Sequence, residues 1–198
     1  VDLEVGGTVE DQGDAFGDLG VLFILIVILV YIVMATQFES LKFPFIIMFT
    51  IPFAFTGVFL ALWMTSTPLS LIALIGAIML VGIVTKNGIV MVDYMNLLIE
   101  RGSGVFDAVI AGGKSRLRPV LMTSFTTILG MLPLAIGTGA GSETWQPMGI
   151  AVIGGLTFST ILTLFIVPVL YSILVNRSQR KEREKLARLA AEHQASVH

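Results

Sequence analysis

One run of almost unbroken apolar residues, Leu69 to Ile99, constrains this chain more than any other feature. About 20 apolar residues in a helix, at 1.5 Å per residue, cross a hydrocarbon core of about 30 Å. Four further runs share this character, and they are too long and too evenly apolar for the alternating strands of a barrel. The sequence therefore predicts an all-α integral membrane protein with five transmembrane helices, at residues 19–36, 43–64, 69–99, 119–136 and 147–175.

Composition supports the membrane class and excludes several others. The chain has 198 residues, of which 55% are hydrophobic and 13% charged, and it contains no cysteine. Disulfides and thiolate metal sites are therefore excluded. The segment from Gly112 to Ser115 resembles the end of a phosphate-binding loop, but Ala108 replaces the earlier glycine that such a loop requires. We expect no enzyme, no cofactor, no metal site and no nucleic-acid partner.

Basic residues predict the orientation, because cytoplasmic connections are enriched in Lys and Arg. Residues 1–18 contain six acidic residues and no basic one. If this segment lies outside, eleven of the twelve Lys and Arg residues fall on the inner side, and the twelfth is Lys86 within the membrane. We therefore expect residues 1–18 to be external, 19–175 to form the transmembrane domain, and 176–198 to be a basic cytoplasmic tail.

Local signals predict where some elements begin and end. Val1 to Val5 alternates apolar and acidic residues as in a half-buried strand, and a Gly-Gly pair follows. Val105 to Ala111 is predicted as a short helix that ends at Gly112-Gly113. Pro119 would then open the fourth transmembrane helix, where its missing N–H is harmless.

The third, fourth and fifth runs carry residues that shape helix packing. Pro133 lies inside the fourth run, and an internal proline predicts a bend near residues 130–133. Small residues allow neighbouring backbones to approach closely. We expect this role for most of Ala73, Gly76, Ala77, Gly82, Gly149, Gly154 and Gly155.

Lys86 stands near the middle of the run 69–99. An ammonium at membrane depth costs roughly 2.5–3.5 kcal/mol on insertion scales, so it should face protein or water and have a partner. Asp93 shares its helical face but lies about 10 Å further along the axis, and helical side chains lean toward the N-terminus. Every other acidic residue lies outside the apolar runs or at their edges. We therefore expect the carboxylate that opposes Lys86 to belong to polypeptide outside this sequence.

A polar stripe follows one face of the fourth run. Arg116, Thr123, Thr127 and Gly130 are spaced by seven, four and three residues. One interpretation is that the arginines only anchor the topology and that the hydroxyls bond to carbonyls of their own helix. This interpretation fits Arg118 and Thr127 well. It fits Arg116 and Thr123 less well, because a buried cation is already present on the preceding helix.

Four segments of the chain together form a recognisable pattern. They are Lys86-Asn87 with the following residues to Asp93-Tyr94, Arg116 to Ser124, Gly130 to Gly141, and Gln37-Phe38-Glu39-Ser40. This pattern closely resembles the C-terminal membrane half of resistance-nodulation-division (RND) efflux pumps. The resemblance extends over essentially the whole chain to about Asn176.

The resemblance implies a larger machine. Members of this family have twelve membrane helices in two pseudo-equivalent halves, carry large periplasmic porter domains, and work as trimers driven by the proton gradient. This chain would be the last five helices, and residues 1–18 would be the periplasmic end of the porter region. The implied partners are the first half of the transporter, a second and third copy, a periplasmic adaptor, an outer-membrane channel, protons and the lipid of a bacterial inner membrane.

The resemblance also assigns roles to individual residues. The family's proton site pairs a lysine that matches Lys86 with two aspartates in the first half, and adds an arginine and a threonine that match Arg116 and Thr123. Asn87 and Asp93 are assigned either a secondary relay role or a packing role. The multidrug branch, which exports hydrophobic and amphiphilic compounds, has a lysine at the Lys86 position, whereas the metal-ion branch differs there. Multidrug efflux by proton antiport is therefore the favoured function.

Two alternatives stay open. An RND-type exporter of metal ions or lipid would share the relay and differ in its porter domain. A non-transporting membrane scaffold or assembly subunit would treat Lys86 as an incidental buried ion pair. The sequence upstream of Val1 separates these hypotheses, since a pump needs an intramembrane aspartate pair and long periplasmic insertions.

Overall fold

The computed structural model describes residues 2–137, 139 and 141–196. Side-chain environments are described for residues 12–137, 139 and 141–177, so Val1 and the side chains of the basic tail from residue 178 lie outside this description. Within the described ranges the chain is helical and has no strand. The helices are α1 (Asp2–Phe38), α2 (Lys42–Met48), α3 (Thr50–Met64), α4 (Leu71–Glu100), α5 (Val105–Ile136) and α6 (Ser142–Ser196).

Five segments are long and apolar enough to cross a membrane, and α2 and α3 together form one of them. A span of this kind can cross a bilayer because each helix satisfies its own backbone hydrogen bonds. The prediction of an all-α protein with five transmembrane helices is therefore confirmed. The spans are Gln12–Phe38, Lys42–Met64, Leu71–Glu100, Val105–Ile136 and Ser142–Arg177.

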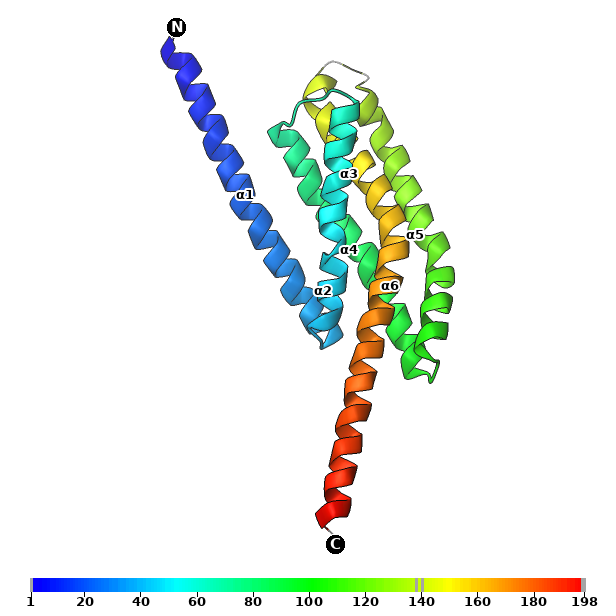
Figure 1. Cartoon of the computed structure of the whole chain (residues 1–198). Coiled ribbons are helices and arrows are strands. Elements are labelled where there is room, and N and C mark those ends of the chain that lie inside the picture. The colour runs from blue at the N-terminus through cyan, green and yellow to red at the C-terminus, as the bar shows by residue number, and fades with distance from the viewer. Residues whose placement is uncertain (1, 138, 140, 197–198) are drawn as a thin grey trace.

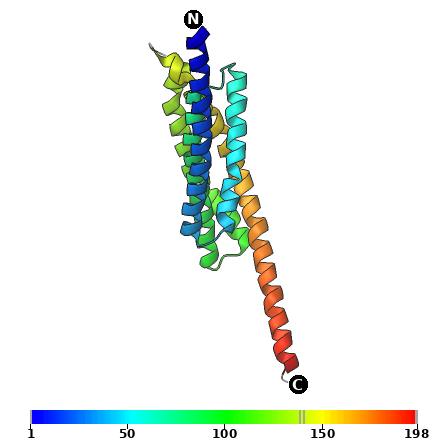
Figure 2. The same cartoon turned by 90° about the vertical axis from the view of Figure 1, so that its left-hand side faces the viewer.

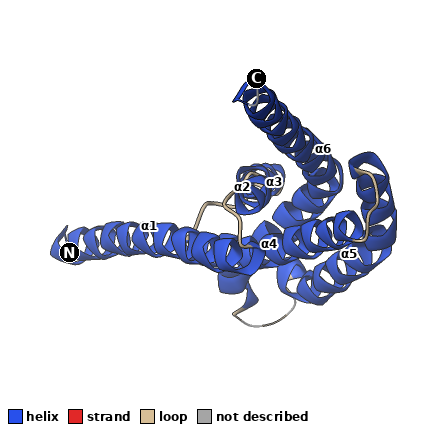
Figure 3. Cartoon of the chain, turned by 90° about the horizontal axis from the view of Figure 1, so that it is seen from below, coloured by secondary structure: helices blue, strands red, loops and turns tan. Residues whose placement is uncertain are grey.

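Helix α6 is the centre of the arrangement, and it packs against α3, α4 and α5. Helix α4 lies between α1 on one side and α5 on the other (Figure 3). Helix α1 packs mainly against α2 and α4, and its N-terminal end points away from the bundle (Figure 1). The C-terminal part of α6 continues past the other helices as a single extension (Figures 1 and 2).

Two clusters of buried apolar side chains form the core, one in each half of the bundle. The half nearer the α3–α4 turn is built from α3, α4 and α6, whereas the half nearer the α4–α5 turn is built from α1, α2, α4 and α6. The first cluster contains Ala54, Val58, Leu62, Ala73, Ala77, Leu80, Val84, Ile150, Ala151 and Leu156. The second contains Met34, Ile46, Ile47, Met91, Val92, Met95, Val167 and Tyr171.

Close backbone packing joins α3 to α6. A Cβ added at Gly57 would lie 2.5 Å from Cβ of Phe158 and 2.8 Å from the carbonyl oxygen of Gly154, and one added at Gly155 would lie 2.7 Å from Val58. The predicted packing role of the small residues is therefore confirmed at Gly154 and Gly155. At Gly82 it has no counterpart among the described residues, because no atom lies within 4 Å of a Cβ built there.

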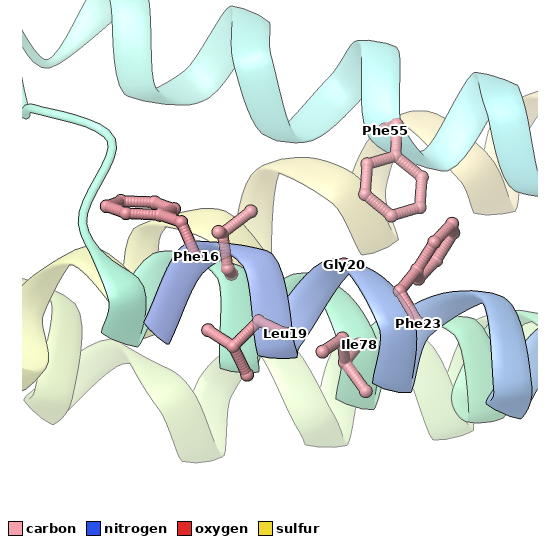
Figure 4. A pocket seen from close by; sticks show the side chains of 7 residues that line it. Phe16, Leu19, Gly20, Phe23, Phe55 and Ile78 are labelled. Atoms are coloured by element: carbon pink, nitrogen blue, oxygen red, sulfur yellow. The ribbon is translucent and has the colours of Figure 1, made fainter. Parts of the chain in front are cut away.

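An apolar recess of about 160 Å³ lies where α1 passes α3 and α4. Phe16, Leu19 and Phe23 of α1 line it together with Phe55 of α3 and Ile78 of α4 (Figure 4). The rings of Phe23 and Phe55 meet edge to face, with centroids 5.1 Å apart. This aromatic contact joins α1 to α3, and the two helices otherwise make little contact.

The predicted strand at Val1 to Val5 is wrong, since residues 2–5 belong to α1. A strand needs a neighbouring strand to pair its N–H and C=O groups, and none exists in the described part of the chain. A helix pairs these groups within itself, so α1 continues without interruption through the acidic segment.

The predicted helix end at Gly112-Gly113 is also wrong, because α5 is continuous from Val105 to Ile136. Gly112 serves close packing instead, since a Cβ there would lie 2.7 Å from Cγ of Met95 on α4. Pro119 consequently lies inside α5 and not at its start. The helix ends at Gly137, whose φ of 71° is in the left-handed region that glycine adopts without strain. A bend at Pro133 stays a prediction.

Candidate functional site

Lys86 lies on the one face of α4 that the other described helices leave uncovered. The buried residues of α4 form the opposite face of the helix and pack against α3, α5 and α6. The exposed residues recur every three, four or seven positions, so they form a single stripe along the helix. The stripe consists of Ile75, Met79, Gly82, Lys86, Asp93, Leu97 and Glu100.

Lys86 makes no hydrogen bond or ion pair with any residue of the described ranges. Asp93 follows it on the same stripe, two helical turns further along α4, and is also exposed. Asn87 is half-buried beside Lys86. The ammonium of Lys86 is thus presented outward from this five-helix unit, on a stripe that carries both apolar and charged residues.

Arg116 and Arg118 occupy different environments. Arg116 is half-buried, and Cζ of its guanidinium lies 4.6 Å from the centroid of the Tyr94 ring on α4. Nε of Arg116 is buried and has no hydrogen-bond partner among the described residues. Arg118, two positions on, is exposed. The structure therefore places Arg116 against the seam between α4 and α5 and Arg118 outside it.

The register of α4 and α5 gives the depth of Lys86 relative to Thr123. In antiparallel helices the residue numbers of facing positions have a nearly constant sum. Gly112 faces Met95 and Arg116 faces Tyr94, so this sum is 207 to 210 for α4 and α5. The positions on α5 that face Lys86 are therefore 121 to 124. Thr123 falls in this interval, so its level along the helix axes is close to that of Lys86.

The threonine hydroxyls of the polar stripe bond within their own helix. Oγ1 of Thr123 lies 3.1 Å from the carbonyl oxygen of Pro119 and 3.0 Å from that of Val120, and Oγ1 of Thr127 donates to the carbonyl of Thr123 at 2.9 Å. The oxygen of each hydroxyl keeps its lone pairs available as an acceptor. Thr123 is exposed, so an incoming donor can reach this oxygen.

A polar recess of about 300 Å³ lies between the end of α1 and the end of α4. Asp93 and Asn96 line it from α4, and Oδ1 of Asn96 accepts a hydrogen bond from the Tyr171 hydroxyl of α6. The Tyr171 ring stacks on Phe43, with centroids 5.5 Å apart. The remaining lining residues are Gln37, Phe38, Glu39, Leu97 and Glu100.

Sequence reasoning missed three features of this region: Tyr94 under Arg116, the Asn96–Tyr171 hydrogen bond, and the bond between Ser124 and Thr160 at 2.9 Å. The first was hidden by the false break at Gly112-Gly113. A continuous α5 that begins five residues after α4 ends would have placed Arg116 within reach of Tyr94. The other two bonds join residues 75 and 36 positions apart, and no local pattern predicts such pairs.

The bundle and its outward-facing lysine define a polytopic membrane protein with an ionisable group within a candidate span, a feature that marks functional sites in membrane proteins. The sequence model of the AcrB/AcrD/AcrF family matches residues 1–175, and the chain belongs to this family. Its members are RND permeases, which are transporters and not enzymes.

Relatives of different stated function are similar to this chain to nearly the same degree. It is 38% identical to the swarming motility protein SwrC of Bacillus subtilis over 182 residues, and this alignment covers 91% of this chain and 17% of SwrC. It is 40% identical over 177 residues to the cobalt-zinc-cadmium resistance protein CzcA of Cupriavidus metallidurans, with coverage of 89% and 17%. It is 44% identical over 155 residues to the multidrug resistance protein MdtC of Erwinia amylovora, with coverage of 78% and 15%.

A solved structure shares the fold. The crystal structure of a heavy metal efflux pump superposes with a TM-score of 0.75 at 31% sequence identity, over 85% of this chain and 16% of the pump. The chain thus spans about one sixth of the length of the relatives that it matches. Membership of the family follows from these comparisons, whereas the branch within the family does not, because metal and multidrug relatives both occur.

Proposed function

We propose that this chain is the C-terminal membrane segment of a proton-driven RND exporter, and that Lys86, Arg116 and Thr123 form its half of an intramembrane proton relay. The observation that carries the proposal is Lys86 itself. It is an ammonium in the middle of a transmembrane helix, on an exposed stripe, with no carboxylate partner among the described residues. Such a charge requires a counter-ion, and the remainder of the transporter would supply it.

The arrangement suggests how proton binding would act. While the opposing carboxylates are ionised, they attract the Lys86 ammonium and offset its desolvation. Protonation removes their charge, so the lysine loses its partner and the two halves of the membrane domain lose an attraction. Thr123, at the same depth, offers a hydroxyl along the path, and Arg116 lies further along α5 toward its N-terminal end. We place that end on the cytoplasmic side, where the protons would leave.

We propose drugs or other amphiphiles as the cargo, exported from a bacterial inner membrane. Support comes from Lys86, which the multidrug branch shares, and from the similarity to a multidrug resistance protein. A metal ion is the second candidate, because a cobalt-zinc-cadmium resistance protein and a heavy metal efflux pump are also similar. The working assembly would be a trimer that includes the first half of the transporter, joined to a periplasmic adaptor and an outer-membrane channel.

A substitution at Lys86 tests the relay. In the full-length transporter, Lys86→Ala should abolish proton-dependent export from reconstituted vesicles while expression and trimer formation stay near normal. Lys114→Ala is the matched control, since Lys114 is an exposed lysine near the start of α5. Export by Lys86→Ala at the wild-type rate would contradict the proposed coupling.

The cargo is tested separately in the same vesicles. A pH gradient should drive transport of a fluorescent amphiphilic dye and should not drive transport of Co²⁺, Zn²⁺ or Cd²⁺. The opposite result would support the metal alternative and leave the relay proposal standing. Failure to transport anything under a pH gradient would support a scaffold.

The two arginines provide a further test. Arg116→Ala and Thr123→Ala should strongly lower export per inserted trimer, whereas Arg118→Ala should mainly lower the amount inserted, because exposed Arg118 would anchor to headgroups. Equal losses of export per trimer for both arginine variants would show that Arg116 has no special role.

A further inference from the structure

The contact between Arg116 and Tyr94 links the two helices that carry the proposed relay. The guanidinium carbon lies 4.6 Å from the ring centroid, within the roughly 6 Å over which the ring quadrupole attracts a cation. Nε of Arg116 is buried without a hydrogen-bond partner among the described residues. The Tyr94 ring is therefore the principal described interaction that fixes where this cation lies.

A glycine one turn earlier makes the contact possible. Gly112 and Arg116 are four residues apart, so they lie on the same side of α5. Glycine allows α5 to approach Met95 this closely without displacing its side chain, because a Cβ at Gly112 would be 2.7 Å from Cγ of Met95. Tyr94 precedes Met95 on α4, so this approach brings its ring within reach of the Arg116 head group.

Arg118 shows how an arginine on the same helix behaves when it does not lie at the α4–α5 seam. It is two positions from Arg116 on the same helix, it is exposed, and it forms no interaction with the described residues. A long cationic side chain in that state extends toward water and headgroups. Without Tyr94, Arg116 would be free to do the same and would leave the seam.

We infer that Tyr94 is a positioning residue that holds the Arg116 guanidinium at the α4–α5 seam through the face of its ring. This inference rests on the proposed function, in which Arg116 acts on the exit path of protons. It names the ring face and not the hydroxyl as the active feature, since Arg116 lies over the ring. Tyr94 therefore affects transport only through Arg116.

The test uses the full-length transporter in vesicles, with dye export under a fixed pH gradient as the measurement. Tyr94→Phe and Tyr94→Trp keep the ring and should export at no less than about half the wild-type turnover. Tyr94→Leu removes it and should lower the maximal turnover roughly five- to thirtyfold, the range that a partly desolvated cation–π contact of about 1–2 kcal/mol provides. The cargo concentration for half-maximal export should stay unchanged, because Tyr94 does not contact cargo.

A double variant separates positioning from mere packing. In the Arg116→Ala background, Tyr94→Leu should cause no further loss, because the residue on which it acts is absent. The inference is overturned if Tyr94→Leu lowers turnover as much in the Arg116→Ala background as in the wild type. It is also overturned if Tyr94→Leu keeps the wild-type turnover or if Tyr94→Phe is inactive. If Tyr94→Leu fails to form trimers, the Phe and Trp variants decide, since inactivity of either refutes a role for the ring face.

Different variants test the proposed function. Wild-type export by Lys86→Ala and Arg116→Ala would contradict the proposed relay itself. If these two variants are inactive and Tyr94→Leu is fully active, the relay stands and only the positioning role of Tyr94 is lost.

Discussion

Replacing Gly57 by alanine should separate α3 from α6. The new Cβ would lie 2.5 Å from Cβ of Phe158 and 2.8 Å from the carbonyl oxygen of Gly154, whereas ordinary contact begins at 3.4 Å. The shortfalls are 3.4 − 2.5 = 0.9 Å and 3.4 − 2.8 = 0.6 Å. Both opposing atoms are fixed by the backbone of α6, so no change of rotamer relieves the overlap, and the helices must move apart.

The cost of this movement follows from what the helices lose. Overpacking a well-packed core typically costs about 1–3 kcal/mol. Each contact along the α3–α6 seam also weakens, since dispersion falls steeply with distance. Alanine gains up to about 1 kcal/mol over glycine in a helix, which partly offsets the cost. Gly113 on α5 provides the control, because a Cβ there meets no atom within 4 Å and the propensity gain is the same.

The assay is thermal unfolding of the purified transporter in detergent, followed by loss of the monodisperse trimer peak. Gly57→Ala should be less stable than Gly113→Ala by about 1–3 kcal/mol, since the propensity gain cancels between them. Gly113→Ala should match the wild type or exceed it slightly. Equal unfolding midpoints for the two variants would refute the view that Gly57 sets the α3–α6 distance.

Two hydrogen bonds between helices, one buried and one part-buried, should contribute measurably to stability. Ser124→Ala and Thr160→Val should each lower the free energy of unfolding by about 1 kcal/mol. The double variant should lose less than the sum, because both substitutions remove the same 2.9 Å bond. Strictly additive losses in a thermal double-mutant cycle would contradict this. Tyr171→Phe keeps the apolar ring and should lose about 1 kcal/mol with its bond to Asn96, as urea or thermal unfolding would show; an unchanged midpoint would mean that the bond contributes nothing.

The membrane fold could be predicted from sequence because hydrocarbon thickness sets a minimum length for every span, whatever the neighbouring helices are. The same reasoning led to Lys86, since the cost of a charge at depth depends on position and not on tertiary detail. Local signals were less reliable where packing overrides them. The Gly-Gly pair at 112–113 is typical of a helix end, yet Gly112 lies within α5 because Met95 needs the space.

The contacts between helices were beyond prediction for a related reason. The polar stripe separates Arg116 from Arg118 in sequence, but only the approach of α4 gives Arg116 an aromatic partner. Thr123 and Thr127 likewise both bond to their own helix, so the hydrogen bonds alone do not distinguish a relay hydroxyl from a structural one. Depth relative to Lys86 does distinguish them, and depth requires the register of two helices.

The central position of α6 has a consequence for how the protein is made. Helices α3, α4 and α5 all pack against α6, which follows them in the chain. From the end of α3 at Met64 to the end of the last span at Arg177 the ribosome adds 177 − 64 = 113 residues, which takes roughly 6 to 23 s at 5–20 residues per second. During that interval the surface around Gly57 lacks the α6 contacts that later cover it. A ribosome that stalls before Ser142 would therefore leave three helices in the bilayer without their common partner, as substrates for membrane proteases.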